Sequence, residues 1–251
     1  SSDTFLVLLL APFIGSFLGL LIVRLPEARP VVFARSICEQ CGHRLGIRYL
    51  VPLLSYAVAF GRCRHCSRSI GLLPISVELA ALGIAVWALL VVHDTDIWQT
   101  CLYGWLLLTL AWIDIRVMIL PDVLTLSLLL AGLITTAIDS PDVFTEHALA
   151  AAIGYSSLAV LAWLYRQLRH RDGLGLGDAK LLGAIAAWSG LTPLPATVFL
   201  AASIGLAFAG IAAVMGRRMT LSTALPFGPC LALAAWVLRL HGGVLTDWFI
   251  G

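Results

Sequence analysis

Residues 101–114 read CLYGWLLLTLAWID, an apolar run that ends in the carboxylate of Asp114. A second carboxylate, Asp178, stands at the start of another apolar stretch, directly after the glycine-rich residues 173–177 (GLGLG). An ionised carboxylate next to hydrocarbon is unfavourable by several kcal/mol unless it is paired, neutralised or hydrated. Two carboxylates at the ends of apolar runs therefore predict a shared proton and acid–base chemistry.

The composition of the chain is that of a membrane protein. Of its 251 residues, 60% are hydrophobic and only 12% are charged, whereas soluble domains carry about 25% charged residues. The mean hydropathy is +0.97. A transmembrane helix needs roughly 20 apolar residues, and apolar runs, of which the sixth is short, occur near 4–23, 74–93, 97–113, 121–138, 147–165, 179–191, 196–215 and 225–240. The sequence therefore predicts an all-α polytopic membrane protein with about eight transmembrane helices.

The basic residues predict how the chain is oriented in the membrane. Eight of the 16 Lys and Arg residues lie in the one long polar segment, 24–73, and alternate loops after it carry all the others except Arg239. The opposite loops contain acidic residues and neither Lys nor Arg. Because positive loops stay in the cytoplasm, we expect segment 24–73, Asp114 and Asp178 at the cytoplasmic face and both termini outside. The first apolar run lacks a basic start and a cleavage site, so it is interpreted as a retained anchor.

Four cysteines in the polar segment indicate a metal site. They form two C-x₂-C pairs, Cys38 with Cys41 and Cys63 with Cys66. A polar segment of this length is too short for a large hydrophobic core, and tetrahedral zinc is the usual staple in such cases. Disulfides are disfavoured in a reducing cytosol. We expect structural zinc, with an iron–sulfur centre or redox pairs as alternatives.

These patterns divide the chain into three predicted parts. Residues 1–23 form the first transmembrane helix, 24–73 the small cytoplasmic zinc-binding segment, and 74–251 a transmembrane domain that carries both aspartates. The remaining cysteines, Cys101 and Cys230, lie in apolar runs and are interpreted as packing residues.

With its motifs taken together, the chain resembles the type IV prepilin peptidases, the bifunctional leader peptidase/N-methyltransferase enzymes of bacterial pilus and type II secretion systems. The resemblance spans nearly the whole chain and rests on the order and spacing of many short motifs. They are Gly15-Ser16-Phe17-Leu18 with Arg24-Leu25-Pro26, Arg35-Ser36, Pro52-Leu53-Leu54-Ser55-Tyr56, Gly61-Arg62-Cys63-Arg64, Glu78, Ile113-Asp114, Leu120-Pro121-Asp122, Gly175-Leu176-Gly177-Asp178, Lys180-Leu181-Leu182 and Pro226-Phe227-Gly228-Pro229. The chain departs from the family at Gly19, where Asn is common, and at Glu39, where Pro is common.

The resemblance implies an enzyme of the bacterial inner membrane with prepilin or pseudopilin precursors as its substrates. It also implies that residues 74–251 are a transmembrane aspartyl protease domain. Their short basic leader would be removed at the cytoplasmic face, and the new amino terminus would be methylated from S-adenosylmethionine. The methyl-transfer site is expected in segment 24–73 and the adjoining start of the second span, including Glu78. No P-loop, dinucleotide fingerprint or basic aromatic patch indicates nucleic acid.

The residues themselves support aspartyl chemistry for Asp114 and Asp178. Two carboxylates sharing one proton provide both the base that activates water and the acid that protonates the leaving amine. Gly175 and Gly177 lack Cβ, so the backbone there can approach an extended substrate. The ordinary alternative for Asp178 is an N-cap of the next helix, and for Asp114 a helix-end charge.

Two further polar residues are candidates for supporting roles. Asp122 follows Pro121 at a predicted helix start, where compensation of the helix dipole is the favoured interpretation. Lys180 either pairs with a carboxylate or marks the cytoplasmic boundary.

Two other functions fit some of these patterns. One is another Gly-x-Gly-Asp intramembrane aspartyl protease, against which the arginine-rich cysteine segment argues. The other is a non-enzymatic zinc-bearing membrane scaffold or transporter, which would need ionisable residues in mid-span, and only Glu78 comes near that requirement.

Overall fold

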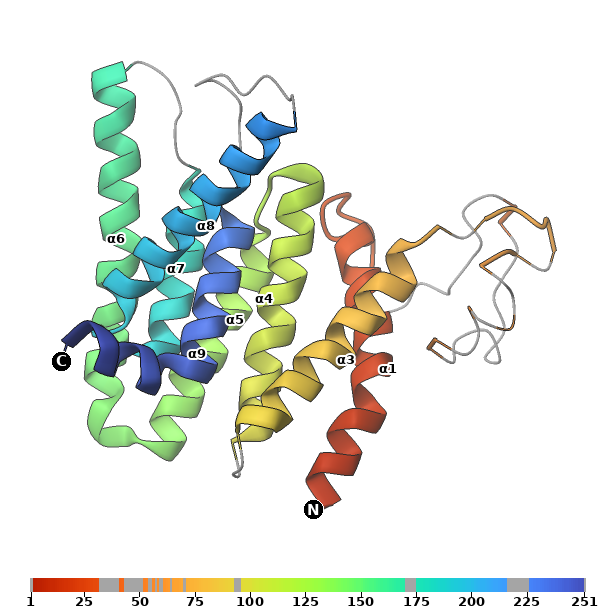
Figure 1. Ribbon diagram of the computed structural model, residues 1–251, viewed down its shortest axis with the longest axis horizontal. Coiled ribbons are helices and arrows are strands. Elements are labelled where there is room, and N and C mark those ends of the chain that lie inside the picture. The colour runs from red at the N-terminus through yellow and green to blue at the C-terminus, as the bar shows by residue number, and fades with distance from the viewer. Residues whose placement is uncertain are drawn as a thin grey trace. The chain divides into compact units, whose positions relative to one another are not determined.

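The computed structural model describes residues 2–31, 41–42, 52–53, 56, 58, 61–63, 65–69, 71–92, 96–169, 175–215 and 226–250, the last eight by backbone alone. Within these ranges the chain is helical and contains no β-strand, only an isolated bridge between Arg62 and Ser69 (Figure 1). The helices are α1 (Ser2–Arg24), α3 (Leu73–Val91), α4 (Ile97–Val117), α5 (Asp122–Asp139), η2 (Pro141–Val143), α6 (Phe144–Arg169), α7 (Leu176–Ser189), α8 (Leu194–Val214) and α9 (Gly228–Ile250).

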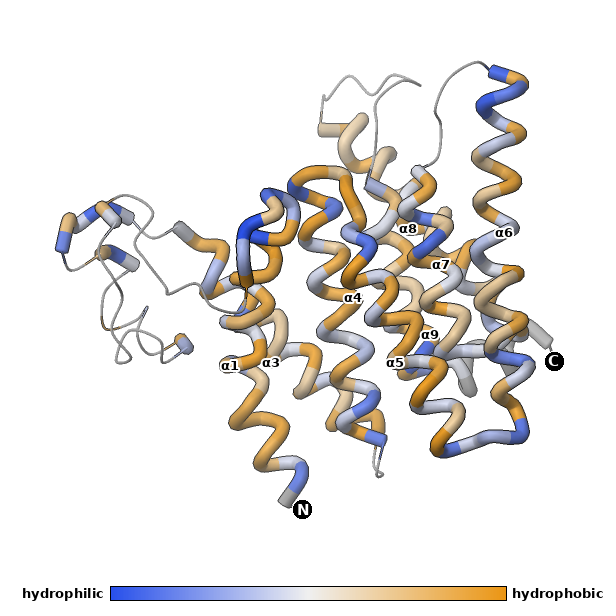
Figure 2. Tube along the Cα trace, turned by 180° about the vertical axis from the view of Figure 1, so that it is seen from behind, coloured by the Kyte–Doolittle hydropathy of each residue, from blue (hydrophilic) through white to orange (hydrophobic). Residues whose placement is uncertain are grey.

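Six of these helices are long and apolar enough to cross a membrane: α1, α3, α4, α5, α6 and α8. Backbone polar groups in hydrocarbon must be satisfied within the segment, so long apolar runs fold as helices. Figure 2 shows hydrophobic residues along much of α1, α3 and α5 and hydrophilic residues at several helix ends. The prediction of an all-α polytopic membrane protein is confirmed, with a helix at each predicted span.

Helix α7 differs from the six. Its 14 residues rise about 21 Å, less than the roughly 30 Å hydrocarbon core. Ten of these residues are buried in protein. The mixture of small and large apolar residues on all sides of α7 is therefore explained by packing against other helices rather than against lipid.

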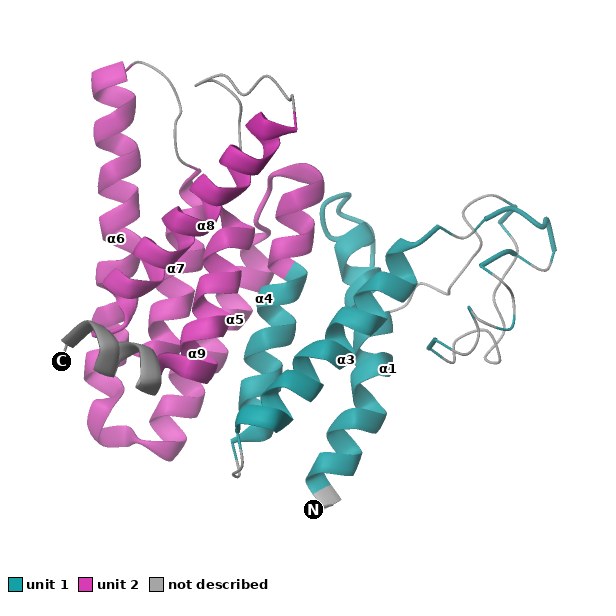
Figure 3. Ribbon diagram, in the orientation of Figure 1, with its two compact units in different colours: residues 1–109 teal, residues 110–251 magenta. Residues whose placement is uncertain are grey.

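Contacts group the chain into two compact units, residues 1–109 and 110–251 (Figure 3). In the first unit α1 packs against α3. A Cβ added at Gly15 would lie 2.7 Å from the Cα of Glu78, so glycine is what permits this close approach. The start of α4 joins the same unit, where the indole nitrogen of Trp105 donates a hydrogen bond to the carbonyl of Ala81 at 3.0 Å.

In the second unit α7 packs against α5, α6 and α9, and α8 packs against α9. One anchor of this packing is Trp188, whose indole nitrogen donates to the carbonyl oxygen of Leu128 at 2.8 Å. The sequence predicted a division into 1–23, 24–73 and 74–251 by function, and the two units do not test it, so it stays a prediction. In the structure α1 ends at Arg24 and α3 begins at Leu73.

Candidate functional site

Asp114 lies near the C-terminal end of α4, with only 5% of its surface exposed. Its Oδ2 atom accepts a hydrogen bond of 3.1 Å from the backbone N–H of Gly228, the first residue of α9. The first N–H groups of a helix have no partner within the helix, and they favour a negative charge. The Asp114 carboxylate therefore occupies the anion-binding end of α9.

Gly228 is the residue that makes room for this carboxylate. A Cβ at position 228 would lie 2.7 Å from Asp114 Oδ2 and 3.2 Å from its carboxyl carbon. Any larger residue would displace either the carboxylate or the start of α9. The Pro226–Pro229 motif, which contributes to the family resemblance, thus forms part of the surroundings of Asp114.

Asp178 lies in the first turn of α7 and is also buried. The N-cap residue of α7 is Gly175. The alternative interpretation of Asp178 as the N-cap of this helix is therefore wrong. The Asp178 N–H donates to the Gly175 carbonyl at 3.1 Å, and the Gly175 backbone also hydrogen-bonds the Asp178 carboxylate. Gly177 is close to Leu120, whose side chain would lie 3.2 Å from an added Cβ.

The fold brings the two aspartates together although they are 64 positions apart in the sequence. Asp114 and Asp178 are near enough to interact electrostatically. The thiol of Cys230, in the first turn of α9, interacts electrostatically with both carboxylates. Neither Cys230 nor Gly228 was singled out as a site residue from sequence. Only the short motif at 226–229 gave a signal, and it gave no role.

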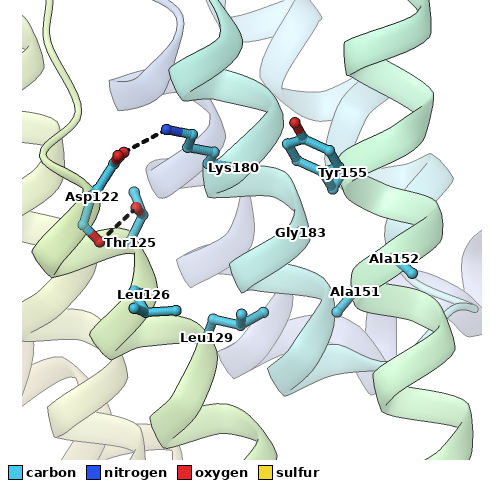
Figure 4. Close-up of a pocket in the computed structure, with 9 residues that line it drawn as sticks. All are labelled: Asp122, Thr125, Leu126, Leu129, Ala151, Ala152, Tyr155, Lys180 and Gly183. Atoms are coloured by element: carbon cyan, nitrogen blue, oxygen red, sulfur yellow. Dashed lines mark hydrogen bonds and ion pairs between the residues drawn. The ribbon is translucent and has the colours of Figure 1, made fainter.

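Asp122 and Lys180 form an ion pair in the same unit as the two buried aspartates. Lys180 Nζ lies 2.6 Å from Asp122 Oδ1, and the two side chains are 41% and 74% exposed (Figure 4). The pair joins the first residue of α5 to the second turn of α7, the helix that carries Asp178. Of the two alternatives for Lys180, the structure therefore contains the pairing with a carboxylate.

The cysteine segment brings three of its four predicted ligands together. The sulfur atoms of Cys41, Cys63 and Cys66 all lie within 4.8 Å of one another, and none is in a disulfide. Cys38 lies outside the described residues. Zinc–sulfur bonds of about 2.3 Å in a tetrahedron place ligand sulfurs roughly 3.8 Å apart, so this donor set could hold a metal ion.

A tight turn builds the second pair of cysteines. Cys63 N–H donates to the Arg68 carbonyl at 2.8 Å, and Ser67 N–H donates to the Cys63 carbonyl at 2.7 Å. Arg62 and Ser69 form an antiparallel bridge beside them, and Ser67 has a φ of 55°. The chain is thereby folded back on itself so that both thiols of the pair point to one place.

Glu78 connects the polar segment to the helices of the first unit. It is 5% exposed within α3, and its Oε2 atom accepts a hydrogen bond of 2.7 Å from the backbone N–H of Leu53. The Ser16 side chain of α1 also hydrogen-bonds Glu78. Leu53, with a φ of 58°, sits between the two cysteine pairs in the sequence, so this buried carboxylate holds the middle of the segment against α1 and α3.

These features define a class: a polytopic membrane protein that buries two interacting carboxylates at helix ends and carries a cysteine cluster between its first spans. Two family models match the chain, the type IV leader peptidase family over residues 101–210 and the bacterial peptidase A24 N-terminal domain over residues 9–93. They include Asp114 with Asp178 and the cysteine segment, respectively.

Curated relatives match along almost the whole chain. Proteins named prepilin leader peptidase/N-methyltransferase are 33% identical in Aeromonas salmonicida (strain A449), over 98% of this chain and 93% of the relative, and 35% identical in Aeromonas hydrophila over the same shares. The Pseudomonas aeruginosa relative of that name is 33% identical over 97% of this chain and 92% of its own length. The chain belongs to the type IV leader peptidase family, as its motifs indicated, and is an enzyme of that family. No solved structure matches it significantly.

Proposed function

We propose that this protein removes the short basic leader from type IV prepilins or pseudopilins, with Asp114 and Asp178 as its acid–base pair. The observation that carries the proposal is the burial of these two interacting carboxylates at helix ends in a leader peptidase family member. The substrate would have a basic leader, a glycine before the scissile bond and an apolar helix after it. Family membership disfavours the scaffold reading and the other Gly-x-Gly-Asp proteases.

The reaction needs one proton shared between the two carboxylates. The ionised carboxylate takes a proton from water as the water oxygen attacks the scissile carbonyl carbon. The protonated carboxyl then gives its proton to the leaving nitrogen as the C–N bond breaks, and the pair returns to its starting charge. The Gly228 N–H, 3.1 Å from Asp114 Oδ2, holds one carboxylate in place throughout, which preorganises the pair.

The membrane arrangement follows from the distribution of charge. We place the protein in the bacterial inner membrane with both termini outside and the aspartates at the cytoplasmic face, because the basic residues lie in alternate loops and basic loops stay in the cytoplasm. The apolar helix of the substrate would then lie in the bilayer, and its cleavage site would reach Asp114 and Asp178 at the boundary.

The cysteine cluster is proposed to hold structural zinc. Cys41, Cys63 and Cys66 offer three thiolate ligands, and Cys38 would supply the fourth. A site closed by four protein ligands contributes folding energy and leaves no open position for chemistry. Its proposed role is therefore to order the cytoplasmic segment.

The protein is also proposed to methylate the amino terminus that cleavage creates. S-adenosylmethionine, when bound, supplies a methyl group from its sulfonium, and the amine that accepts it loses a proton. This chain would contribute the binding surface in segment 24–73 and the start of α3, where Glu78 fixes Leu53.

The test is incubation of the purified protein with a prepilin-like precursor, with and without the methyl donor, followed by mass spectrometry. Asp114→Asn and Asp178→Asn should each lower cleavage by at least about 10³-fold, because the two residues act as one unit. Asp114→Asn should still methylate a pre-cleaved substrate, since methyl transfer needs a free amine and no aspartyl pair. Near wild-type cleavage by either variant would exclude that residue from catalysis.

A further inference from the structure

The second unit contains a cavity of about 440 Å³ between α5, α6 and α7. Most of its lining is apolar or small, and the Asp122–Lys180 ion pair lies at one end of it, called the mouth below (Figure 4). The lining residues are Asp122, Thr125, Leu126, Leu129, Ala151, Ala152, Tyr155, Lys180 and Gly183. The mouth marks one end of a membrane span, because Asp122 begins α5.

We propose that this groove binds one zwitterionic glycerophospholipid, with an acyl chain between α5 and α6 and the headgroup on the ion pair. The charges at the mouth are complementary to a headgroup that carries both a phosphate and an ammonium. Lys180 has three N–H donors and Asp122 two carboxylate oxygens, so a headgroup can contact both while their mutual bond of 2.6 Å is kept. Both side chains are exposed enough for this contact, at 41% and 74%.

The dimensions of the groove suit an acyl chain. The α5 wall covers the eight residues from Asp122 to Leu129, which rise about 10 Å along the helix, about a third of the hydrocarbon thickness. Leu126 is 52% exposed and Tyr155 43% exposed. Both side chains therefore face the lipid tails that surround this part of the protein in a membrane.

The position of the groove on α7 argues against the substrate helix as its occupant. Asp178 and Lys180 are two residues apart, so their side chains leave α7 in directions about 200° apart. The groove therefore lies on the side of α7 opposite the buried carboxylate of Asp178. An apolar helix that begins at the scissile bond would have to cross α7 to enter it. A lipid has no such constraint, and its binding here holds whether or not the aspartates catalyse cleavage.

Native mass spectrometry of the purified full chain tests the proposal. The protein is exchanged into mixed micelles with equal amounts of phosphatidylethanolamine and phosphatidylglycerol, and retained lipid is counted. Wild type should keep one phosphatidylethanolamine per chain with a preference of about tenfold over phosphatidylglycerol, the lower end of the range that one hydrogen bond to a charged group provides. Asp122→Asn should reverse the preference, because Lys180 alone favours an anionic headgroup.

Two variants fill the groove from different walls. Ala152→Trp on α6 and Leu126→Trp on α5 replace exposed side chains and should each lower retention at least tenfold. The matched control is Ala207→Trp, at an exposed alanine of α8 outside the groove, which should retain lipid as wild type does. The proposal is overturned if all three tryptophan variants retain lipid equally, if wild type shows no headgroup preference, or if saturating precursor strips the lipid from wild type.

Discussion

Replacing Gly228 by alanine should disable the Asp114 carboxylate while leaving the fold intact. The new Cβ would lie 2.7 Å from Asp114 Oδ2 and 3.5 Å from its Cβ. Real Cβ atoms are essentially never found closer than 3.0 Å to a heavy atom. The carboxylate must therefore rotate away from α9 or α9 must shift, and either movement breaks the 3.1 Å hydrogen bond from the Gly228 N–H.

The size of the effect follows from the lost bond and the displaced group. A hydrogen bond to a charged group contributes about 1.5–3 kcal/mol, which corresponds to a factor of roughly 10 to 150. A displacement of about 1 Å at a catalytic group lowers a rate by about 10²-fold. We expect kcat for leader cleavage to fall about 10- to 150-fold with KM little changed, because the change acts on the Asp114 carboxylate.

The assay is cleavage of a prepilin-like precursor, measured as kcat and KM, with thermal unfolding of the same preparations. The matched control is Gly210→Ala in α8, where an added Cβ meets nothing within 4 Å. This change should leave cleavage unaltered and raise stability slightly, since alanine is about 1 kcal/mol better than glycine within a helix. Methylation of a pre-cleaved substrate serves as an internal control and should persist in both variants.

Three results would refute this reasoning. Wild-type cleavage by Gly228→Ala would show that the contact with Asp114 does not position a catalytic group. Equal losses in cleavage and methylation would point to general damage. A loss confined to KM would assign Gly228 to substrate binding instead.

Three further predictions concern other contacts of the structure. Glu78→Ala loses the hydrogen bond from Leu53, so it should speed limited proteolysis of segment 24–73 by about 10- to 100-fold and should reduce methylation. Glu78→Gln keeps an acceptor and should behave as wild type, and equal behaviour of the two variants would contradict the role of Glu78 in holding Leu53. The Asp122–Lys180 pair is partly exposed, so in detergent without phospholipid a double-mutant cycle of thermal stability should give a coupling of only about 0.2–1 kcal/mol, and a larger value would show that other parts of the protein bury the pair. Elemental analysis should find one zinc per chain, lost on chelation or in Cys63→Ser and kept in Cys101→Ala, while bound iron with visible absorption would exclude zinc.

The helices were predictable because the membrane leaves a long apolar run few other options. Each predicted span corresponds to a helix, since unsatisfied backbone groups in hydrocarbon are too unfavourable to persist. The predicted span 179–191 is the instructive case. Hydropathy located α7 (Leu176–Ser189) and already predicted a short span, but it could not show that the helix is buried by protein, because apolar residues facing lipid and apolar residues facing protein have the same composition.

The two aspartates could be found from sequence because charge is conspicuous in an apolar run. Their surroundings could not. The hydrogen bond from Gly228 to Asp114 joins residues 114 positions apart, and the bond from Leu53 to the other buried carboxylate, Glu78, joins residues 25 positions apart. Such contacts depend on how the helices pack. The sequence alone cannot distinguish a glycine that permits a close approach, such as Gly228, from one with no neighbour within 4 Å, such as Gly210.

The shortness of α7 has a consequence for how the protein responds to its membrane. Helices that face lipid adjust to a thicker or thinner bilayer by tilting, and α8, with Phe199 and Leu206 well exposed, is of this kind. Helix α7 is held by protein on most sides, and its depth is set by α5, α6 and α9. Changes in acyl-chain length should therefore reorient the outer helices first, while Asp178 keeps its distance from Asp114 across membranes of different thickness.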